Sequence, residues 1–395
     1  MRIRTLIKLV PVFARSLTSL PLRHVWYLTR QLRFEQLHIH NDRIYVNTFL
    51  PPIPSPAFDR LLNAVIHKKR VPFSTYFAIT DECPFKCSHC SYGRRASGEM
   101  TTAQALDVIE QIKGLGTTTL GFSGGEPLLR QDLPKLIQAV GPDTETIIFT
   151  TGHTLDAAKA AQLRKAGLNS LMIGMESDIA STHDAVRGVP GSFDEGMEAI
   201  RLGLDAGLYT AISTVATHDK IKDNTIEKMA NLARDLKVHE FRILEPVPTG
   251  RALGQTSALI TPAERHTLTT FHKQWNQAKK GPAIASFSHL ESDAMFGCGA
   301  GYHHLYIDAC GEVCPCDLTP LSFGNVLNTP LATIWQQMGE VFTQPRCSCF
   351  AAKACCDLAK QSQTGSLPLP VDKTTELCQS HPCEGPLPRV YDNLS

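Results

Sequence analysis

The stretch "FSTYFAITDECPFKCSHCSYGRR", residues 73–95, sets the fold and the chemistry of this chain. Its first eight residues, rich in aromatic and β-branched side chains, predict a buried strand. Three cysteines follow at once, spaced Cys83-x3-Cys87-x2-Cys90. Thiolates this close favour a metal site. A structural zinc takes four ligands, and the fourth could be His89 or a distant residue. A four-iron cluster normally takes four thiolates, so three would leave one iron open.

Strands and helices alternate from residue 72 to about residue 246. We expect helices at 102–114, 131–140, 155–166, 193–206 and 222–236. The strands are expected at 73–80, 117–123, 145–151, 169–176, 208–216 and 240–247. Repeated βα units predict a parallel sheet, here an open or partial (β/α)6 barrel in an α/β protein. Ligands bind at the carboxyl ends of such strands, which is where the three cysteines lie.

Thirteen cysteines in 395 residues are unusual, and none falls between residues 91 and 297. This distribution, without an apparent signal peptide, argues for metal binding in a reducing cytoplasm rather than a disulfide scaffold. From about residue 285, short strands and dense Cys, Gly and Pro predict a small α+β domain stabilised by metal. We expect three parts: 1–70, 71–282 and 283–395. The formal net charge of +1 argues against a nucleic-acid-binding protein.

The amino-terminal segment is basic and apolar. Residues 1–34 contain seven Arg or Lys and no Asp or Glu, in a pattern of amphipathic helices broken at Pro21. A hairpin is expected at 37–48 around Asn41-Asp42, then a helix at 57–69. Residues 1–34 either lie on an anionic membrane surface or pack on the enzyme with a solvated basic face. No apolar run is long enough for a transmembrane helix.

The cysteine spacing after the first strand resembles the signature of the radical S-adenosylmethionine (SAM) enzymes. A second match ends the second strand, where Gly124-Gly125-Glu126-Pro127 resembles the GGEP motif of that family. The resemblance implies a [4Fe–4S] cluster held by Cys83, Cys87 and Cys90, and a SAM amino group received by the GGEP residues. Glycines allow close backbone approach and a carboxylate can accept from an ammonium. A tight turn is the structural alternative for GGEP.

Three further positions match the family more loosely. The resemblance implies that Arg187 approaches the SAM carboxylate, which a guanidinium fork suits, and that Ser213 and Thr214 contact the ribose. The alternatives are a surface arginine and structural hydroxyls. Upstream, Gly174-Met175-Glu176-Ser177 departs from the Ser-Leu-Asp-Gly of the family, so that SAM contact is in doubt. His89 either stacks near adenine or is a loop histidine.

The second cysteine set resembles a SPASM domain, a carboxyl-terminal extension of some radical SAM enzymes. Twelve residues separate Cys298 from Gly311, and four more precede Cys316. The run Cys347-x-Cys349-x5-Cys355-Cys356 then departs from the Cys-x2-Cys-x5-Cys-x3-Cys of the family. Two auxiliary [4Fe–4S] clusters are implied, with ligands among Cys298, Cys316, Cys347, Cys349, Cys355, Cys356 and Cys378. The roles of Cys310, Cys314 and Cys383 are open, as are a single cluster, an open cluster site or a zinc-stabilised domain.

The implied reaction is reductive cleavage of SAM, in which the 5′-deoxyadenosyl radical takes a hydrogen from an unactivated C–H bond. It needs a one-electron donor of the flavodoxin or ferredoxin type. The basic amino terminus favours a lipid or other membrane-associated substrate, with the protein cytoplasmic or peripheral on the membrane. Maturation of a peptide or protein and tetrapyrrole modification are the alternatives. A non-catalytic zinc or iron–sulfur protein is the alternative class, and the sequence identifies no catalytic acid or base.

Overall fold

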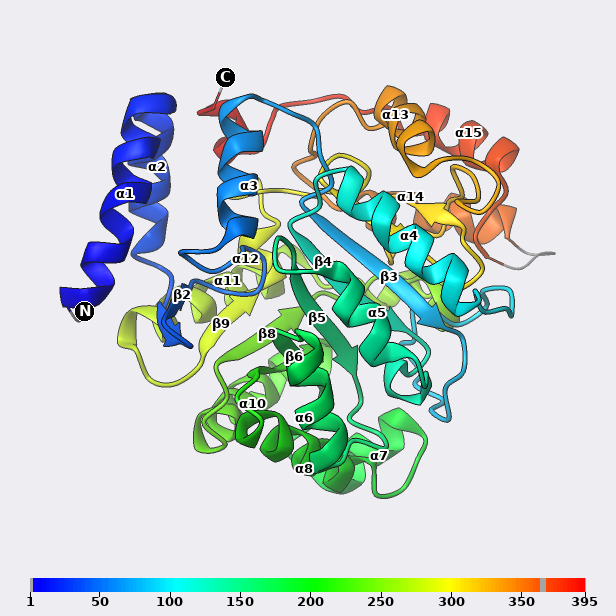
Figure 1. The fold of residues 1–395 in the computed structure, drawn as a ribbon. Helices are drawn as coiled ribbons and strands as arrows, with labels where there is room; N and C mark the ends of the chain where they lie inside the picture. The colour runs from blue at the N-terminus through cyan, green and yellow to red at the C-terminus, as the bar shows by residue number, and fades with distance from the viewer. Residues whose placement is uncertain (1–2, 363–366, 395) are drawn as a thin grey trace.

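The computed structural model describes residues 3–362 and 367–394, which are built around one nine-stranded sheet (Figure 1). Six neighbouring parallel strands, each followed by helical structure, form the predicted partial barrel, so the predicted fold class is confirmed. These strands are β3 (Ser74–Thr80), β4 (Thr119–Gly124), β5 (Glu145–Thr150), β6 (Ser170–Gly174), β7 (Tyr209–Val215) and β8 (Glu240–Leu244).

Three short strands extend the sheet at both edges, in the part of the chain where the sequence predicted short strands without giving their bounds. β9 (Ala283–Ser286) pairs parallel with β8. On the other side, β10 (His304–Ile307) pairs parallel with β3, and β11 (Val313–Cys314) pairs antiparallel with β10. Strands of two to four residues carry no readable periodicity. Through β10, the cysteine-rich segment joins the same sheet that carries the Cys83 loop.

The helices of the barrel lie outside the sheet. Two begin with a capping box, in which Thr101 and Gln104, and Thr261 and Glu264, satisfy the first free N–H groups. The helices are α4 (Thr102–Gly114), α5 (Leu133–Val140), α6 (Ala157–Ala166), α7 (Ala180–Arg187), α8 (Ser192–Asp205), α9 (His218–Lys222), α10 (Thr225–Asp235), α11 (Pro262–Ala278) and α12 (Phe287–Leu290). Short 3₁₀ turns are η1 (Pro127–Leu129), η2 (Gly250–Ala252) and η3 (Thr256–Ala258).

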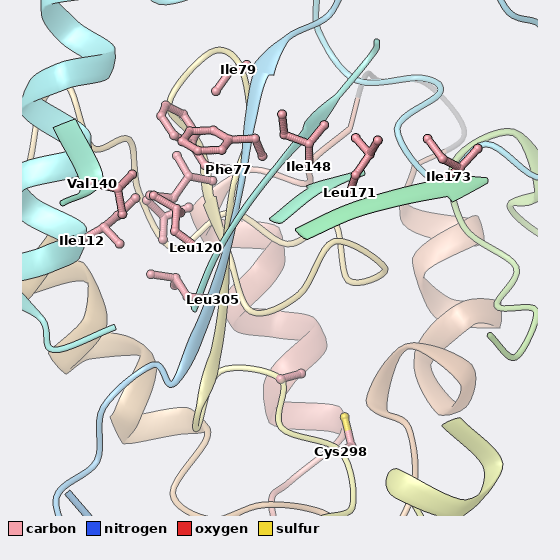
Figure 2. Close-up of a cluster of buried hydrophobic side chains, with 14 of the residues drawn as sticks. Phe77, Ile79, Ile112, Leu120, Val140, Ile148, Leu171, Ile173, Cys298 and Leu305 are labelled. Atoms are coloured by element: carbon pink, nitrogen blue, oxygen red, sulfur yellow. The ribbon is translucent and has the colours of Figure 1, made fainter. Parts of the chain in front are cut away.

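The main hydrophobic core fills the space between the sheet and its outer helices. Figure 2 shows Phe77, Leu120 and Ile148, from three adjacent strands, with Ile112 of α4 and Val140 of α5, and all five are buried. Each such side chain contributes about 1.5–3 kcal/mol on burial. This core stabilises the barrel from outside, whereas a smaller cluster of Ile147, Met172 and Ala211, with Phe149 packed against it, lies on the other face of the strands.

The longer carboxyl-terminal helices gather at one end of the sheet, at the upper right in Figure 1. They are α13 (Leu331–Val341), α14 (Phe350–Gln361) and α15 (Val371–Ser380). The short helix α16 (Arg389–Asp392) instead packs against α2 (Leu22–Leu32). The α13 helix packs against α4, and Leu331 N donates to Gln111 Oε1 at 2.8 Å. Most of the cysteines beyond residue 340 lie on or next to α14 and α15.

The amino-terminal segment forms two helices, α1 (Ile3–Ser19) and α2 (Leu22–Leu32), which separate at Pro21 as expected. The predicted hairpin is also confirmed as β1 (His38–His40) and β2 (Arg43–Tyr45), with Asn41 and Asp42 at φ of 46° and 59°. The α3 helix (Pro56–Ile66) follows the cap residue Ser55. Within the described residues, no helix is long and apolar enough to cross a membrane.

Buried polar contacts fix the amino-terminal helices to the barrel. Glu35, just after α2, is buried with an oxygen 3.2 Å from His272 Nε2 of α11 and 3.8 Å from His289 Nε2 of α12. Ring nitrogen Nδ1 of His24 lies 3.0 Å from the carbonyl of Val390. Thr48 donates to Glu240 from its N–H at 2.7 Å and from its hydroxyl at 2.6 Å.

Candidate functional site

The three-cysteine loop leaves the carboxyl end of β3, as the sequence predicted. Desolvation raises the pKa of the Cys83 thiol to about 11, although a hydrogen bond from the backbone of Phe85 opposes it. The charges of nearby Glu126, Cys87 and Cys90 raise this pKa further, so the three thiols lie close together. Deprotonating the Cys83 thiol therefore needs a positive partner, which fits a metal cluster bound by this loop.

The two glycines of the GGEP motif let the end of β4 pack against the cysteine loop. A Cβ on Gly124 would lie 2.2 Å from Thr80 O, and one on Gly125 would lie 2.2 Å from Glu82 O. Their neighbouring amides donate across this contact: Gly125 N to Thr80 O and Glu126 N to Glu82 O, both at 2.8 Å. Only glycine fits these positions, and Pro127 then starts η1.

Glu126 of the same motif is fully buried and already bonded within the chain. Its carboxylate accepts from Thr151 N at 2.8 Å, Thr151 Oγ1 at 2.7 Å and Leu128 N at 3.1 Å, and also from the Thr150 hydroxyl. Glu126 therefore fixes the end of β4 to the end of β5. These four donors already occupy the roughly four lone-pair sites of a carboxylate, so its expected bond to a SAM ammonium stays a prediction that requires one donor to be displaced.

Arg187 at the end of α7 is buried rather than a surface arginine. Its guanidinium donates to Gly174 O at 2.6 Å, to Glu176 Oε1 at 3.3 Å and to the sulfur of Cys87 at 3.4 Å. The side chain thus connects the cysteine loop to the end of β6 and places positive charge beside the predicted SAM carboxylate position.

Glu176 is the centre of a charge cluster that sequence reasoning missed. It is buried and meets Lys220 Nζ at 2.6 Å and His89 Nε2 at 3.3 Å, besides Arg187. Burial opposes ionisation, but Lys220 and then His89 and Arg187 hold the pKa of Glu176 well below its usual value. His89 therefore contacts a carboxylate in this structure. The only signal in the sequence was Glu176 itself, at the end of a strand in a motif that departs from the family pattern.

The two hydroxyls that end β7 differ. The Thr214 hydroxyl donates to Glu176 Oε2 at 3.3 Å and accepts from Lys220 Nζ at 2.9 Å, so it belongs to the charge cluster. Ser213 lines the cavity described next. Lys220 lies on the five-residue helix α9, which carried no sequence signal.

One cavity of about 840 Å³ runs through the barrel from the carboxyl ends of the strands to their amino ends. These two ends are called the carboxyl edge and the amino edge. At the carboxyl edge it meets the three-cysteine loop and the GGEP residues. Tyr76, Phe149 and Arg242 line its middle, where the buried guanidinium donates to Tyr76 Oη at 3.4 Å and to Glu240 Oε1 at 3.4 Å. At the amino edge it meets Ser74 and Thr119, which start β3 and β4.

Three cysteines of the carboxyl-terminal segment line the amino-edge end of this cavity: Cys298, Cys316 and Cys349. A hydrogen bond from Cys349 and backbone N–H groups of Phe350 and Ala300 lower the pKa of Cys298 to about 6, against the effect of burial. Leu318 N donates to the sulfur of Cys316 at 3.4 Å. Amide donors to sulfur suit cluster thiolates, so this donor set fits an iron–sulfur cluster.

The other carboxyl-terminal cysteines lie outside the cavity. Those around α14 and α15 are Cys347, Cys355, Cys356, Cys378 and Cys383. Cys310 instead donates to Ala96 O at 3.6 Å, and Cys314 accepts from Arg95 Nη1 at 3.7 Å. The environments of Cys310 and Cys314 are set by Asp308, Glu312 and Arg95.

Comparison with known proteins follows this division of the chain. The model for the radical SAM superfamily matches residues 77–236, and the model for the SPASM iron–sulfur cluster-binding domain matches residues 298–358. The chain is a radical SAM enzyme with a carboxyl-terminal SPASM domain. A radical SAM enzyme uses a [4Fe–4S] cluster and SAM, and the SPASM domain holds auxiliary clusters. The enzyme class replaces the alternative of a non-catalytic zinc or electron-transfer protein.

Curated relatives of this radical SAM enzyme have different substrates. An AdoMet-dependent heme synthase of Nitratidesulfovibrio vulgaris is 28% identical over 294 residues, covering 68% of this chain and 79% of the relative. A PqqA peptide cyclase of Granulibacter bethesdensis is 27% identical over 277 residues, covering 67% and 74%. These identities leave the substrate of this enzyme open.

Solved structures agree on the fold of this radical SAM enzyme. Streptococcus suis SuiB bound to S-adenosylmethionine matches with a TM-score of 0.58 and 17% identity, covering 74% of this chain and 75% of SuiB. The enzyme anSMEcpe with bound AdoMet matches with a TM-score of 0.55 and 16% identity, covering 81% and 98%.

Proposed function

We propose that this radical SAM enzyme works at a membrane surface and abstracts a hydrogen from an unactivated C–H bond of a lipid or another membrane-associated molecule. The observation that carries the proposal is the cavity, which connects the three-cysteine loop to the inner faces of the amino-terminal helices. The expected division into 1–70, 71–282 and 283–395 then assigns substrate entry, SAM chemistry and auxiliary clusters to successive parts of the chain.

The lining of the cavity supports an apolar substrate. Its amino-edge end is walled by side chains from three amino-terminal helices: Leu9 and Val12 of α1, Val25 and Leu28 of α2, and Phe58, Leu61 and Leu62 of α3. A cavity of about 840 Å³ falls within the size range of small-molecule sites. An apolar chain in this passage would lie beside the auxiliary cysteines and reach towards the SAM site.

The outer face of the same helices supports membrane contact. Val10, Leu22 and Trp26 are 62%, 70% and 61% exposed, and Leu17 is also exposed. Basic residues accompany them without any acidic residue in 1–34. An interfacial helix pair needs this combination of apolar side chains for the acyl region and basic ones for anionic headgroups.

The residues of the chain have separate tasks in this proposal. Cys83, Cys87 and Cys90 hold the cluster at which SAM supplies a 5′-deoxyadenosyl radical when bound. Gly124 and Gly125 let the backbone close around that cluster loop. Glu176, with Lys220 and Arg187, fixes a charged wall beside the SAM position. Tyr76 and Phe149 exclude water along the substrate path.

We further propose that Cys298, Cys316 and Cys349 bind one auxiliary cluster and that Cys347, Cys355, Cys356 and Cys378 supply the ligands of a second. The reductant that the family requires is proposed to be of the flavodoxin or ferredoxin type. A tetrapyrrole is the second candidate substrate, because three AdoMet-dependent heme synthases are 28–29% identical to this chain.

The test uses SAM cleavage and vesicle binding together. Anaerobically reconstituted enzyme is mixed with anionic phosphatidylglycerol vesicles, neutral phosphatidylcholine vesicles or iron coproporphyrin. The double variant Leu22→Glu/Trp26→Glu is expected to lose sedimentation with anionic vesicles. Ile179→Glu, which changes an equally exposed apolar side chain on another face, should keep it.

Total membrane lipid from a bacterium is then added in detergent, and 5′-deoxyadenosine formation is measured beside a Cys83→Ala/Cys87→Ala/Cys90→Ala control. Stimulation by lipid supports the proposal. Stimulation by the tetrapyrrole alone transfers it to the second candidate. Unchanged vesicle binding by the double variant would refute membrane docking.

A further inference from the structure

Two side chains next to Cys316 complete a group of metal-binding atoms at the amino-edge end of the cavity. A ring nitrogen of His304, the sulfur of Cys316 and a carboxylate oxygen of Asp317 lie within 4.8 Å of one another. The antiparallel pairing of Tyr306 with Cys314 brings His304, at the start of β10, opposite Cys316, just beyond β11. The sheet itself therefore places the imidazole beside the sulfur.

The imidazole of His304 is held in one orientation. Its Nδ1 lies 2.7 Å from the hydroxyl of Ser74, its partner in the parallel pairing of β10 with β3. Its ring packs edge-on against Tyr76, with 4.7 Å between the ring centroids. Nε2 then faces the cysteine side, 3.5 Å from Asp317 Oδ1. Histidines that bind metals commonly use one nitrogen for the metal and the other for such an orienting hydrogen bond.

Three cysteines line this end of the cavity, which is one thiolate fewer than the four that normally bind a four-iron cluster. The other two cysteines of the β10–β11 region do not supply the fourth. Cys310 points to Ala96 and Cys314 to Arg95. The thiols around α14 and α15 lie outside the cavity lining and belong to the second proposed cluster.

We propose that His304 is the fourth ligand of the auxiliary cluster held by Cys298, Cys316 and Cys349. This inference rests on the cluster assignment made under the proposed function. A neutral imidazole in place of a thiolate leaves the cluster one charge unit less negative. Histidine ligation raises the reduction potential of Rieske centres in the same direction. The cluster at the amino-edge end of the cavity therefore has the higher reduction potential of the two auxiliary clusters and is the better electron acceptor.

The experiment observes the auxiliary clusters without the SAM cluster. The Cys83→Ala/Cys87→Ala/Cys90→Ala variant, expressed without a histidine tag, is reconstituted, reduced and studied by pulsed EPR. We expect the strong ¹⁴N coupling of a coordinated imidazole, which changes to a ¹⁵N pattern when the protein is grown with ¹⁵N-histidine. Adding His304→Cys should remove the coupling and shift the potential of one cluster downwards.

His303→Gln is the matched control, because it changes the adjacent histidine, whose ring stacks on Tyr391 and Phe73, and should keep the coupling. The ligand assignment alone is overturned if the ¹⁴N coupling survives His304→Cys. It is also overturned if the coupling is absent from a protein that contains the iron and sulfide of two clusters. A protein without auxiliary iron overturns the cluster assignment of the proposed function together with it. If the His304→Cys variant does not fold, ¹⁵N-histidine labelling of the protein with His304 intact still tests whether a histidine binds the cluster.

Discussion

The buried carboxyl group of Glu35 makes the attachment of the amino-terminal helices sensitive to pH. Burial raises the pKa of Glu35 to about 8, with only a weak opposing contact from Asn47. The groups that face it, His272 and His289, have pKa values lowered by burial to about 3 and about 2. Lys273, which contributes to both histidine shifts, is the nearby cation. Glu35 is therefore protonated, and both histidines are neutral, near pH 7.

The sign of the pH dependence follows from proton binding. The folded state keeps a proton on Glu35 up to about pH 8, whereas the unfolded chain releases this proton near pH 4.5. The resulting contribution to the free energy of unfolding is fully present below about pH 4.5 and is lost as pH rises through about 8. The two histidines affect the free energy of unfolding only below about pH 6.5, where they bind protons in the unfolded chain but stay neutral in the folded state. From about pH 6.5 to about pH 9, the Glu35 contribution to the free energy of unfolding should fall by about 2 kcal/mol.

Glu35→Gln removes the titrating group and keeps the shape of the side chain. We expect the thermal midpoint of the unsubstituted holoenzyme to fall by about 2 °C over this pH range and that of the variant to fall less. The Glu264→Gln variant is the control, because Glu264 also pairs with a histidine but has its pKa lowered to about 2. Identical slopes for the unsubstituted protein and Glu35→Gln would refute a raised pKa at Glu35.

Three further outcomes follow from the site. Gly125→Ala should prevent binding of the SAM cluster, because the new Cβ would meet a backbone oxygen at 2.2 Å, and iron per chain should fall by about a third in a protein with three clusters. Lys220→Met should lower the free energy of unfolding by about 3 kcal/mol, since it leaves the charge of Glu176 poorly compensated, and adding Glu176→Gln should restore part of the loss in denaturant titrations. Cys310→Ser should keep the iron content of the unsubstituted enzyme, whereas Cys349→Ser should lower it.

The strands of the barrel could be predicted because each is a run of apolar residues long enough to carry a period, bounded by turn signals. The spacing of Cys83, Cys87 and Cys90 needs no tertiary information either, since all three lie in one loop. The sequence could not predict which residues from distant parts of the chain lie close together in the fold. Glu176 and Lys220 are 44 residues apart, and only the closure of β6 and β7 brings them together.

The auxiliary region was harder to predict for a physical reason. Its ligands are arranged by the two-residue strand β11 and the four-residue strand β10, whose positions depend on pairing with β3 rather than on their own sequences. Local propensity is weak in such strands. Alternation along a strand would place Cys314 and Cys316, two residues apart, on the same face. Cys316 lines the cavity and Cys314 does not, because Cys316 lies beyond the end of β11, where the chain has left the strand.

Residues 1–34 pack on the enzyme through one face of their helices, and the proposed membrane contact would use the other face. Leu9 and Val12 of α1 face the cavity, while Val10 and Leu17 are exposed. A helix that only covered the barrel would need one apolar stripe, and its outer face would be polar. An open barrel, in turn, needs a cover at the amino edge to keep water from a radical reaction. A cover that is apolar on both faces satisfies that need. Under the proposed function it would also give an apolar substrate a continuous path from a lipid surface to the SAM site. Loss of membrane docking should then reduce turnover of lipid while leaving cleavage of SAM alone unchanged.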